Sequence, residues 1–360
     1  MPFNKVLIIR LSALGDVAMT IPVVYSLCRQ YPATTFILLT RPALTRLFIE
    51  RPANLQLFAA AVKGRHAGLR GLYTLYKDLR RLSVDAVADL HDVLRTKVLD
   101  LFFKMSGVPV ARINKGRAEK KKLTSRRKPA LFQSESSFDR YSDVFRKLGM
   151  EFSYTFHSLF SGGTGDAALL YNITPPKNEG EIWMGVAPFA KHKGKIYPID
   201  KMEKVVAHFA GKEGYKVFLF GGGKGEQDIL DQWGRKYPGI ISLAGKRYGF
   251  ELELTLISLL DVMISMDSAN MHLASLVATP VISVWGATHV CCGFYGWNQS
   301  LNNCIQTDLS CRPCSVFGNK PCWRKDYACM ESILPDEIIN KIELLSLIHI
   351  SEPTRPRLIS

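Results

Sequence analysis

A carboxylate at a strand-to-helix turn is the first group in this chain that could do chemistry. Residues 5–24 read KVLIIRLSALGDVAMTIPVV, in which an apolar run is followed by Arg10, Ser12, Gly15 and Asp16. Such a run is typical of a strand covered on both faces of a parallel sheet, and Gly15 permits backbone angles that other residues resist. Asp16 would then lie at a helix start, at the sheet edge where ligands bind. It could serve as a general base or simply cap its helix.

A basic loop in the second half of the chain could bind phosphate. Residues 187–198 read APFAKHKGKIYP and carry Lys191 and Lys195 before a helix expected near Pro198. Lysine supplies charge and three donors without fixed geometry, which suits a diphosphate leaving group that gains charge during a reaction. An ordinary basic surface loop would have the same composition.

A second strand-to-helix turn follows at residues 266–275, MDSANMHLAS. We expect a strand to end and a helix to begin here, and the free N–H groups of a helix start bind phosphate oxygens. The groups of this turn are Asp267, Ser268, Ala269, Asn270 and His272. A capping Asp and a packed His would explain the same residue types.

Other nucleotide motifs are missing from the sequence. The Gly-rich stretch FGGGKGEQD at 220–228 departs from the dinucleotide-binding spacing, and no P-loop with Gly-Lys before Ser or Thr occurs. This argues against a nucleoside triphosphatase and weakens the dehydrogenase interpretation. No Asp-x-Asp pair occurs either, so we expect chemistry without a divalent metal ion.

Strands that alternate with helices would position these groups. Predicted strands cover 35–40, 84–90, 182–188, 216–223, 261–267 and 279–286, and predicted helices cover 69–82, 200–213 and 225–236. This alternation predicts parallel α/β sheets. The 360 residues exceed one ordinary core, and the Gly/Pro-rich stretch 161–180 resembles a linker. We therefore predict two Rossmann-like α/β domains, 1–165 and 166–346, facing each other across a cleft.

Composition limits the partners and the compartment. The formal net charge is +15, which favours an anionic partner. No apolar run reaches the length of a membrane span, and the first residues lack a secretory signal, so we expect a cytoplasmic protein. The basic run at 115–129 is expected to be an exposed loop, either solvated or in contact with a phosphorylated acceptor or an anionic membrane.

Cysteines concentrate in the segment 304–329, which follows Cys291 and Cys292. A Cys-x-x-Cys pair with further cysteines is compatible with a structural zinc site, for which the candidates are Cys304, Cys311, Cys314 and Cys322. Reduced structural thiols are the other interpretation, since the cytosol keeps thiols reduced. From Leu347 the text LIHISEPTRPRLIS breaks the preceding helical pattern and resembles a translated cloning adapter. We therefore expect 347–360 to be a non-native tail.

Three motifs in register resemble one known family. The segment RLSALGDVAMTIP at 10–22, the loop ending at Lys195–Pro198 and the segment Asp267–His272 are similar to motifs of ADP-heptose:lipopolysaccharide heptosyltransferases, glycosyltransferase family 9. The resemblance covers residues 4–346. It implies a two-domain GT-B fold, with the acceptor bound mainly by the first domain and the nucleotide sugar by the second.

The resemblance also implies roles for single residues. Asp16 matches the proposed catalytic base, Lys195 matches a lysine on the donor phosphate, and the segment 267–272 matches the motif that holds the diphosphate. Ser268 and Ala269 stand where the family has Thr and Gly, and the added methyl group of Ala269 could move the donor. The implied donor-binding residues are Lys191, Lys195, Asp267, Ser268, Ala269, Asn270 and His272. The implied acceptor-binding residues are Arg10, Ser12, His91 and Arg95, although a helix cap and a surface Arg would explain the last two as well.

The expected reaction is inverting transfer of a heptose from ADP-heptose to an acidic inner-core acceptor on lipid A, without a cofactor or metal. We expect the enzyme to lie at the inner face of the cytoplasmic membrane and to bind no nucleic acid. One alternative keeps the fold and changes the donor. Another is a zinc-stapled nucleic-acid binder, which Asp16 and the absence of aromatic residues in the run 115–129 argue against.

Overall fold

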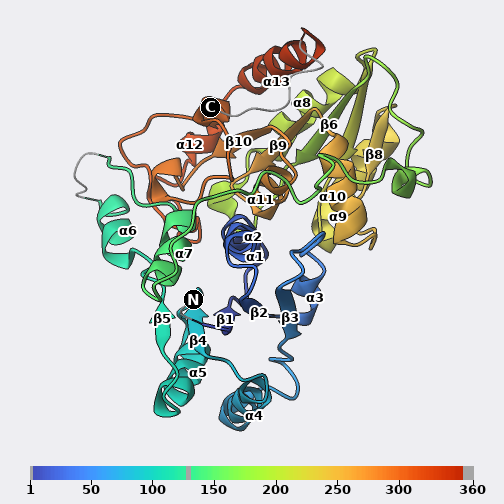
Figure 1. Ribbon diagram of the computed structural model, residues 1–360. Helices are drawn as coiled ribbons and strands as arrows, with labels where there is room; N and C mark the ends of the chain where they lie inside the picture. Colours follow the sequence, from blue (N-terminus) through green and yellow to red (C-terminus); the bar gives the residue numbers. More distant parts are fainter. Residues whose placement is uncertain (1–2, 127–130, 352–360) are drawn as a thin grey trace. The chain divides into compact units, whose positions relative to one another are not determined.

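The computed structural model describes residues 3–126 and 131–351, and it divides the chain into two compact units (Figure 1). Unit 1 comprises Met1–Arg117 and Glu135–Leu159, and unit 2 comprises Ala118–Ser134 and Phe160–Ser360. Each unit has its own parallel sheet. No helix within the described residues is long and apolar enough to cross a membrane.

Unit 1 is built on a five-stranded parallel sheet. In spatial order its strands are β3 (Leu55–Ala59), β2 (Thr35–Thr40), β1 (Lys5–Ile9), β4 (Ala86–Asp89) and β5 (Val110–Arg112). Its helices are α1 (Leu14–Ala18), α2 (Thr20–Gln30), α3 (Pro42–Thr45), α4 (Gly68–Arg80), α5 (Leu94–Met105) and α7 (Ser137–Arg146). The strand order reverses between β1 and β4, and the carboxyl ends at such a switch point are where open α/β sheets bind ligands.

Helices cover both faces of this sheet, with α4 and α5 on one face and α2 and α7 on the other (Figure 1). Leu7 and Ile9 of β1 share one buried cluster with Leu72 and Leu75 of α4 and Phe103 of α5. The intervening residues of β1 are buried as well. A strand buried on both faces loses its polar alternation, which is why β1 is apolar from Val6 to Ile9.

Unit 2 contains a six-stranded parallel sheet. In spatial order its strands are β11 (Cys304–Gln306), β10 (Val281–Trp285), β9 (Val262–Met266), β6 (Ile182–Ala187), β7 (Tyr215–Leu219) and β8 (Ile240–Ser242). Its main helices are α8 (Ile199–Ala210), α9 (Lys224–Lys236), α10 (Phe250–Leu259), α11 (Ala269–Leu276), α12 (Ala328–Glu331) and α13 (Pro335–Ser351). The order reverses between β6 and β9, so these two strands define a second switch point.

Every predicted strand and helix is present, but four strands were missed. They are the edge strands of the two sheets, β3, β5, β8 and β11. Each has only one residue that is fully buried, whereas every residue of β6, β9 and β10 is buried. A short, half-exposed strand lacks the continuous apolar run that marks a central one.

The sequence predicted an exposed loop for the basic run at 115–129, but part of this run is a helix with buried side chains. Within it, α6 (Arg117–Leu123) buries Lys120 and Leu123. Leu123 packs with Cys291 and Cys292, and the Lys120 ammonium lies 4.1 Å from the centre of the Phe294 ring. Residues 127–130 of this run lie outside the described residues.

These contacts explain why the division into units differs from the single cut predicted at residue 165. The segment Ala118–Ser134 belongs with unit 2, and unit 1 continues to Leu159. A sequence pattern cannot reveal this, because a short segment joins whichever core buries its apolar side chains.

The predicted break in helical pattern at Leu347 is wrong. Helix α13 continues to Ser351, since the stretch between Leu347 and Ser351 contains no Pro or Gly. The next proline is Pro353, which would interrupt a helix. Residues 352–360 of the predicted tail lie outside the described residues.

Candidate active site

Asp16 lies at the switch point of unit 1, in an ion pair. Its Oδ2 atom is 2.7 Å from Nη2 of Arg10, which directly follows β1. The same oxygen accepts a hydrogen bond from the Ala13 backbone N–H at 3.1 Å, so Asp16 also caps α1. The Asp16 side chain remains 35% exposed. The capping and functional interpretations are therefore compatible, because one carboxylate can cap the helix and still meet a substrate.

Arg10 is fixed by buried partners. Its Nη1 donates to the carbonyl oxygen of Leu90 at 2.6 Å, and its guanidinium lies 5.8 Å from the centre of the Tyr141 ring. The Tyr141 hydroxyl donates to the backbone carbonyl of Asp16 at 3.3 Å. The guanidinium favours the ionised form of Asp16, and the buried Arg–Tyr contact keeps the pair in one orientation.

Gly15 does not supply a left-handed turn here. It is the second residue of α1 and has helical geometry. Helices of L-residues need no special backbone freedom, so the predicted backbone role of Gly15 is not observed.

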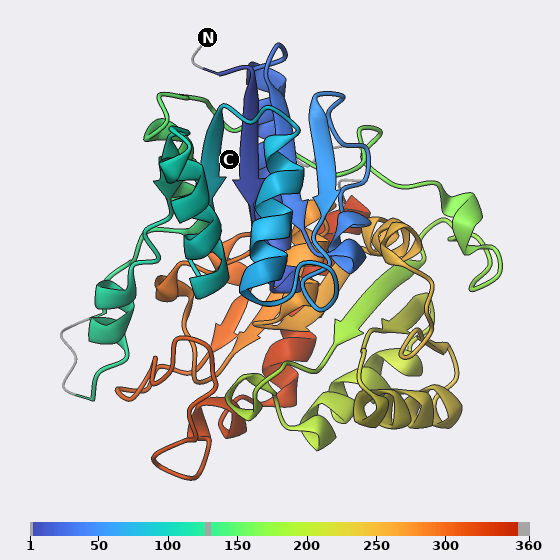
Figure 2. The same ribbon diagram turned by 90° about the horizontal axis from the view of Figure 1, so that it is seen from below.

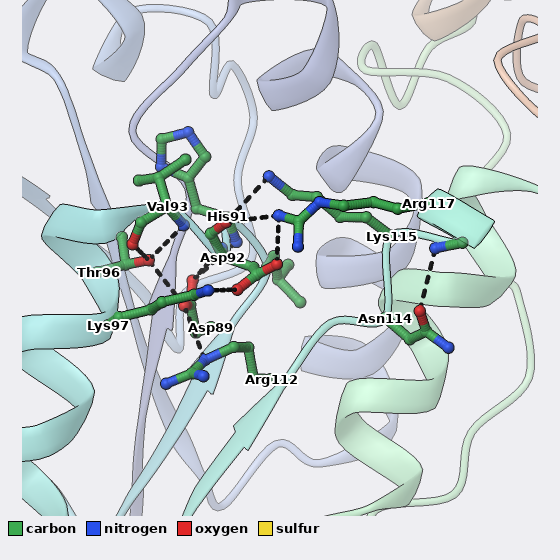
Figure 3. A network of polar contacts seen from close by, with 12 residues as sticks. Asp89, His91, Asp92, Val93, Thr96, Lys97, Arg112, Asn114, Lys115 and Arg117 are labelled. Atoms are coloured by element: carbon green, nitrogen blue, oxygen red, sulfur yellow. Dashed lines mark hydrogen bonds and ion pairs between the residues drawn. The ribbon is translucent and has the colours of Figure 1, made fainter. Parts of the chain in front are cut away.

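The turn after β4 is organised by the buried Asp89 (Figure 3). Its Oδ1 atom accepts from the backbone N–H groups of His91 at 2.8 Å and Asp92 at 3.0 Å. Its Oδ2 atom accepts from the Thr96 hydroxyl at 2.8 Å. Asp89 therefore fixes the conformation of the turn and, with it, the positions of His91 and Asp92.

His91 is buried and neutral. Burial, followed by the charges of Arg10 and Lys115, lowers its pKa to about 3. Its Nδ1 atom is buried and has no hydrogen-bond partner among the described residues. A neutral His91 does not supply the positive charge that an acidic group of the acceptor would pair with.

Two cations beside His91 can supply that charge instead. Arg117 Nη2 pairs with Asp92 Oδ2 at 2.7 Å, and Lys115 Nζ donates to the Asp92 carbonyl at 3.2 Å (Figure 3). Burial and the nearby Arg10 lower the pKa of Lys115. In the sequence both residues stand out only as members of the basic run at 115–129, whereas the fold brings them to the switch point of unit 1.

The other two predicted acceptor-binding residues, Ser12 and Arg95, make fewer polar contacts at this switch point. Ser12 is half-buried in the turn before α1, and Arg95 is the second residue of α5. The Arg95 side chain makes no hydrogen bond or ion pair with any residue in 3–126 or 131–351. Arg41, which the sequence did not single out, donates to the Leu11 carbonyl at 2.9 Å and so supports this turn.

The switch point of unit 2 holds a second ion pair. Lys195 Nζ lies 2.9 Å from Asp267 Oδ2. Lys195 comes from the turn after β6, and Asp267 directly follows β9, so neighbouring strands bring together two residues far apart in sequence. Lys191, from the same turn, is exposed.

Helix α11 begins directly after Asp267. Ser268 is its N-cap residue, and the Ser268 side chain accepts no capping hydrogen bond from the helix. The first N–H groups of α11, at Ala269 and Asn270, therefore remain available to phosphate oxygens. His272 is the fourth residue of the same helix, and its side chain is buried.

Two residues missed by sequence reasoning position Lys195. Gly318 has a φ of 72°, and a Cβ atom there would clash with the side chain of Lys195. The buried Arg312 donates to the Gly286 carbonyl at 2.6 Å, and the adjacent Ala287 N–H donates to Gly194 at 2.8 Å. A glycine before Asn within a loop is a turn signal that could have pointed to Gly318.

The zinc interpretation receives no support from the fold. Across 3–126 and 131–351, no three His, Cys, Asp or Glu side chains gather as a metal-binding group. The candidate ligands Cys304, Cys311, Cys314 and Cys322 are free thiols. Cys304 is the first residue of strand β11, and Cys311, Cys314 and Cys322 lie in the loops that follow it.

Known structures share this architecture. The fold matches a glycosyltransferase family 9 protein from Veillonella parvula with a TM-score of 0.72 and 17% identity, covering 96% of this chain and 98% of that one. It also matches ADP-heptose lipopolysaccharide heptosyltransferase II from E. coli, with a TM-score of 0.68 and 16% identity, covering 96% and 99%. Two parallel α/β sheets of this kind define the GT-B type of glycosyltransferase fold.

Sequence comparison identifies the family. The model of glycosyltransferase family 9 (heptosyltransferase) matches residues 72–322, so the chain belongs to this family. A curated relative, lipooligosaccharide heptosyltransferase 2 of Campylobacter jejuni, is 24% identical over 172 residues. That alignment covers 46% of this chain and 52% of the relative, so the chain spans about half the length of the curated relative it matches.

Proposed function

We propose that this protein transfers a heptose from ADP-heptose to an inner-core acceptor of lipopolysaccharide, with inversion and without a metal ion. The observation that carries the proposal is the placement of the predicted base and the predicted phosphate-binding groups, each at the switch point of its own sheet. Membership of a family described as heptosyltransferases supports the sugar class. Similarity to the E. coli ADP-heptose lipopolysaccharide heptosyltransferase II supports ADP-heptose as the donor.

In this mechanism Asp16 is the general base. An acceptor hydroxyl oxygen attacks the anomeric carbon while Asp16 takes its proton, and the bond from that carbon to the diphosphate breaks. The exposed part of the Asp16 carboxylate is accessible to a hydroxyl group, and Arg10 keeps the base ionised before the reaction. Attack opposite the leaving group inverts the anomeric configuration.

Unit 2 would bind the nucleotide sugar and stabilise the leaving diphosphate. Lys195 would turn from Asp267 to a phosphate oxygen, and the first N–H groups of α11 at Ala269 and Asn270 would bind the others. Asp267 would hold Lys195 in place between turnovers, and Ser268 would add a hydroxyl donor. Lys191 would reach the diphosphate from the exposed side of the turn, and His272 would hold α11 in place.

Unit 1 would bind the acceptor. Arg10, Ser12 and His91 line the turns around Asp16, and Lys115 and Arg117 would neutralise a phosphate or carboxylate of the acceptor. Arg95 would contact an acceptor that extends towards α5. We propose that the enzyme works in the cytoplasm at the inner face of the membrane, because that is where such an acceptor is built.

The test is a transfer assay over a panel of nucleotide sugars and acceptors, with and without a metal chelator. We expect the largest rate with ADP-heptose, product formation that the chelator leaves intact, and an inverted anomeric centre by NMR. Asp16→Asn keeps the capping hydrogen bond but removes the base. Asp166→Asn is the matched control, because Asp166 is an exposed capping residue in unit 2 that accepts from the Ala168 N–H.

Equal transfer by the wild type and Asp16→Asn would contradict the assignment of the base. A larger rate with another nucleotide sugar would instead favour the same fold with a different donor, for which Ala269 in place of the family's Gly is the reason. Binding of DNA at physiological salt with no response to any nucleotide sugar would contradict the whole proposal.

A further inference from the structure

Helices α4 and α5 leave a set of large apolar side chains in solvent. We call this set the α4–α5 stripe, and its members with their exposed fractions are Leu69 (72%), Tyr73 (47%), Leu94 (81%), Leu101 (55%) and Met105 (76%). Single exposed apolar residues are common on proteins, but several on two adjacent helices form a patch that requires an explanation.

The geometry of the helices makes these side chains one surface. On α5, Leu94, Leu101 and Met105 are seven and eleven residues apart, which places them on one face over a length of about 16 Å. On α4, Leu69 and Tyr73 are four residues apart and share a face. The Tyr73 ring packs edge-on against Phe102 of α5 at 5.7 Å and joins the two helices. Figure 2 shows α4 and α5 side by side in front of the sheet.

The charged residues of the two helices have one sign at the surface. The exposed ones are all cations, namely Arg70, Lys77, Arg80, Lys97 and Lys104. The two acids, Asp78 and Asp100, are largely withdrawn from solvent, and each is paired with an Arg side chain. Apolar side chains flanked only by cations form the pattern of a helix that lies in the headgroup region of an anionic bilayer.

We propose that the α4–α5 stripe docks unit 1 onto an anionic lipid surface. Its apolar side chains would insert at the headgroup level, and the exposed cations of α4 and α5 that flank it would contact the lipid phosphates. Both helices follow strands of a parallel sheet, so their first turns, at Leu69 and Leu94, lie at the carboxyl edge that also holds Asp16. Docking would place the face of the sheet that α4 and α5 cover on the membrane, with the carboxyl edge at one end of the contact. The inference rests on the proposed function in one respect only: it takes the acceptor to be anchored in the same membrane.

Charge decides between this occupant and a second copy of the chain. A symmetric dimer through the same patch would bring the five exposed cations of one copy against those of the other. Like charges in a closing interface oppose association, whereas phosphate headgroups complement them. The lipid surface is therefore the occupant that the observations favour.

Vesicle flotation of the full chain tests the docking. We expect binding to vesicles of phosphatidylcholine mixed with anionic phosphatidylglycerol, little binding to phosphatidylcholine alone, and weakening as salt rises and screens the cations. Leu101→Glu with Met105→Glu should reduce partitioning about tenfold or more. Leu334→Glu with Leu344→Glu is the matched control, because these residues are 58% and 53% exposed in unit 2, and it should bind like the wild type.

A second variant keeps the test decisive if the first destabilises the fold. Arg70→Glu with Lys104→Glu changes only exposed cations, and it should weaken binding to anionic vesicles while its melting temperature stays near that of the wild type. Equal vesicle binding by the wild type, the Leu101→Glu/Met105→Glu variant and the Arg70→Glu/Lys104→Glu variant would overturn the proposal. So would loss of self-association in the stripe variants, measured by sedimentation, without loss of vesicle binding.

Transfer assays separate this proposal from the proposed function. Stripe variants should retain transfer to a water-soluble acceptor fragment and lose it with the acceptor embedded in vesicles. If no sugar is transferred to either acceptor by the wild type, the proposed function fails while vesicle binding still decides the docking. If stripe variants lose transfer to the soluble fragment as well, the stripe acts on catalysis itself and the docking interpretation is wrong.

Discussion

The two units have the same kind of sheet switch point, but the buried member of the ion pair there has the opposite charge. Each sheet reverses its strand order beside its central strand, and each places an ion pair at that point. In unit 1 the cation, Arg10, is buried and the carboxylate of Asp16 is accessible. In unit 2 it is the acid, Asp267, that is buried, and the lysine has a flexible stem that can turn to another anion. Under the proposed mechanism, unit 1 would supply the base and unit 2 the cation for the phosphate.

The largest effect that we predict is on the transfer rate, through a change in unit 1. We expect Asp16→Asn to lower the transfer rate by about 10²–10⁴, the usual contribution of a general base, and to leave ADP affinity unchanged. Steady-state kinetics and calorimetry with ADP check the two halves of this prediction. A large loss of ADP affinity would mean that Asp16 serves the donor and that the division of labour is wrong.

The next effect belongs to unit 2. Lys195→Ala should weaken ADP binding about 10–100-fold, because a charged hydrogen bond contributes roughly 1.5–3 kcal/mol. Isothermal titration with ADP measures this change. Lys193→Ala provides the control, since Lys193 lies in the same turn but its ammonium is 4.9 Å from the centre of the Tyr327 ring. Equal losses for both lysines would indicate a general charge effect instead of a specific phosphate contact.

A smaller effect concerns the neutral histidine of unit 1. The pKa of His91 is about 3 in the folded protein and near 6.5 in an unfolded chain. Between these values the unfolded chain binds the extra proton, so stability falls as the pH drops below 6.5. Between pH 7 and 5, the unfolding free energy of His91→Gln should fall less than that of the wild type, by about 1–2 kcal/mol. Denaturant titration at both pH values measures this, and the exposed His157→Gln is the control.

The smallest effect comes from the support of Asp16. Tyr141→Phe removes one hydrogen bond to the Asp16 carbonyl and keeps the ring beside Arg10. We expect the unfolding free energy to fall by about 0.5–1.5 kcal/mol and the transfer rate to stay close to that of the wild type. A drop in rate as large as that of Asp16→Asn would show that the hydroxyl group itself takes part in the reaction.

The central strands and their turns could be predicted because their burial is written into the sequence. Strands β1, β6, β9 and β10 are buried along most or all of their length, and such strands read as continuous apolar runs. Once those strands are placed, the carboxyl-edge positions of Asp16, Lys195 and Asp267 follow from the rule that parallel strands end at one edge. The family motifs then gave these same residues their proposed roles.

The edge strands, the membership of the segment 118–134 and the partners of each charge were decided only by the tertiary structure. Whether His91 is charged depends on burial and on Arg10 and Lys115, which come from other parts of the chain. Whether Leu101 and Met105 enter a core depends on what covers α5, and no pattern within the helix contains that information. Local sequence fixes which faces are apolar, but contacts between distant segments decide which of those faces are buried and which stay free to bind a partner.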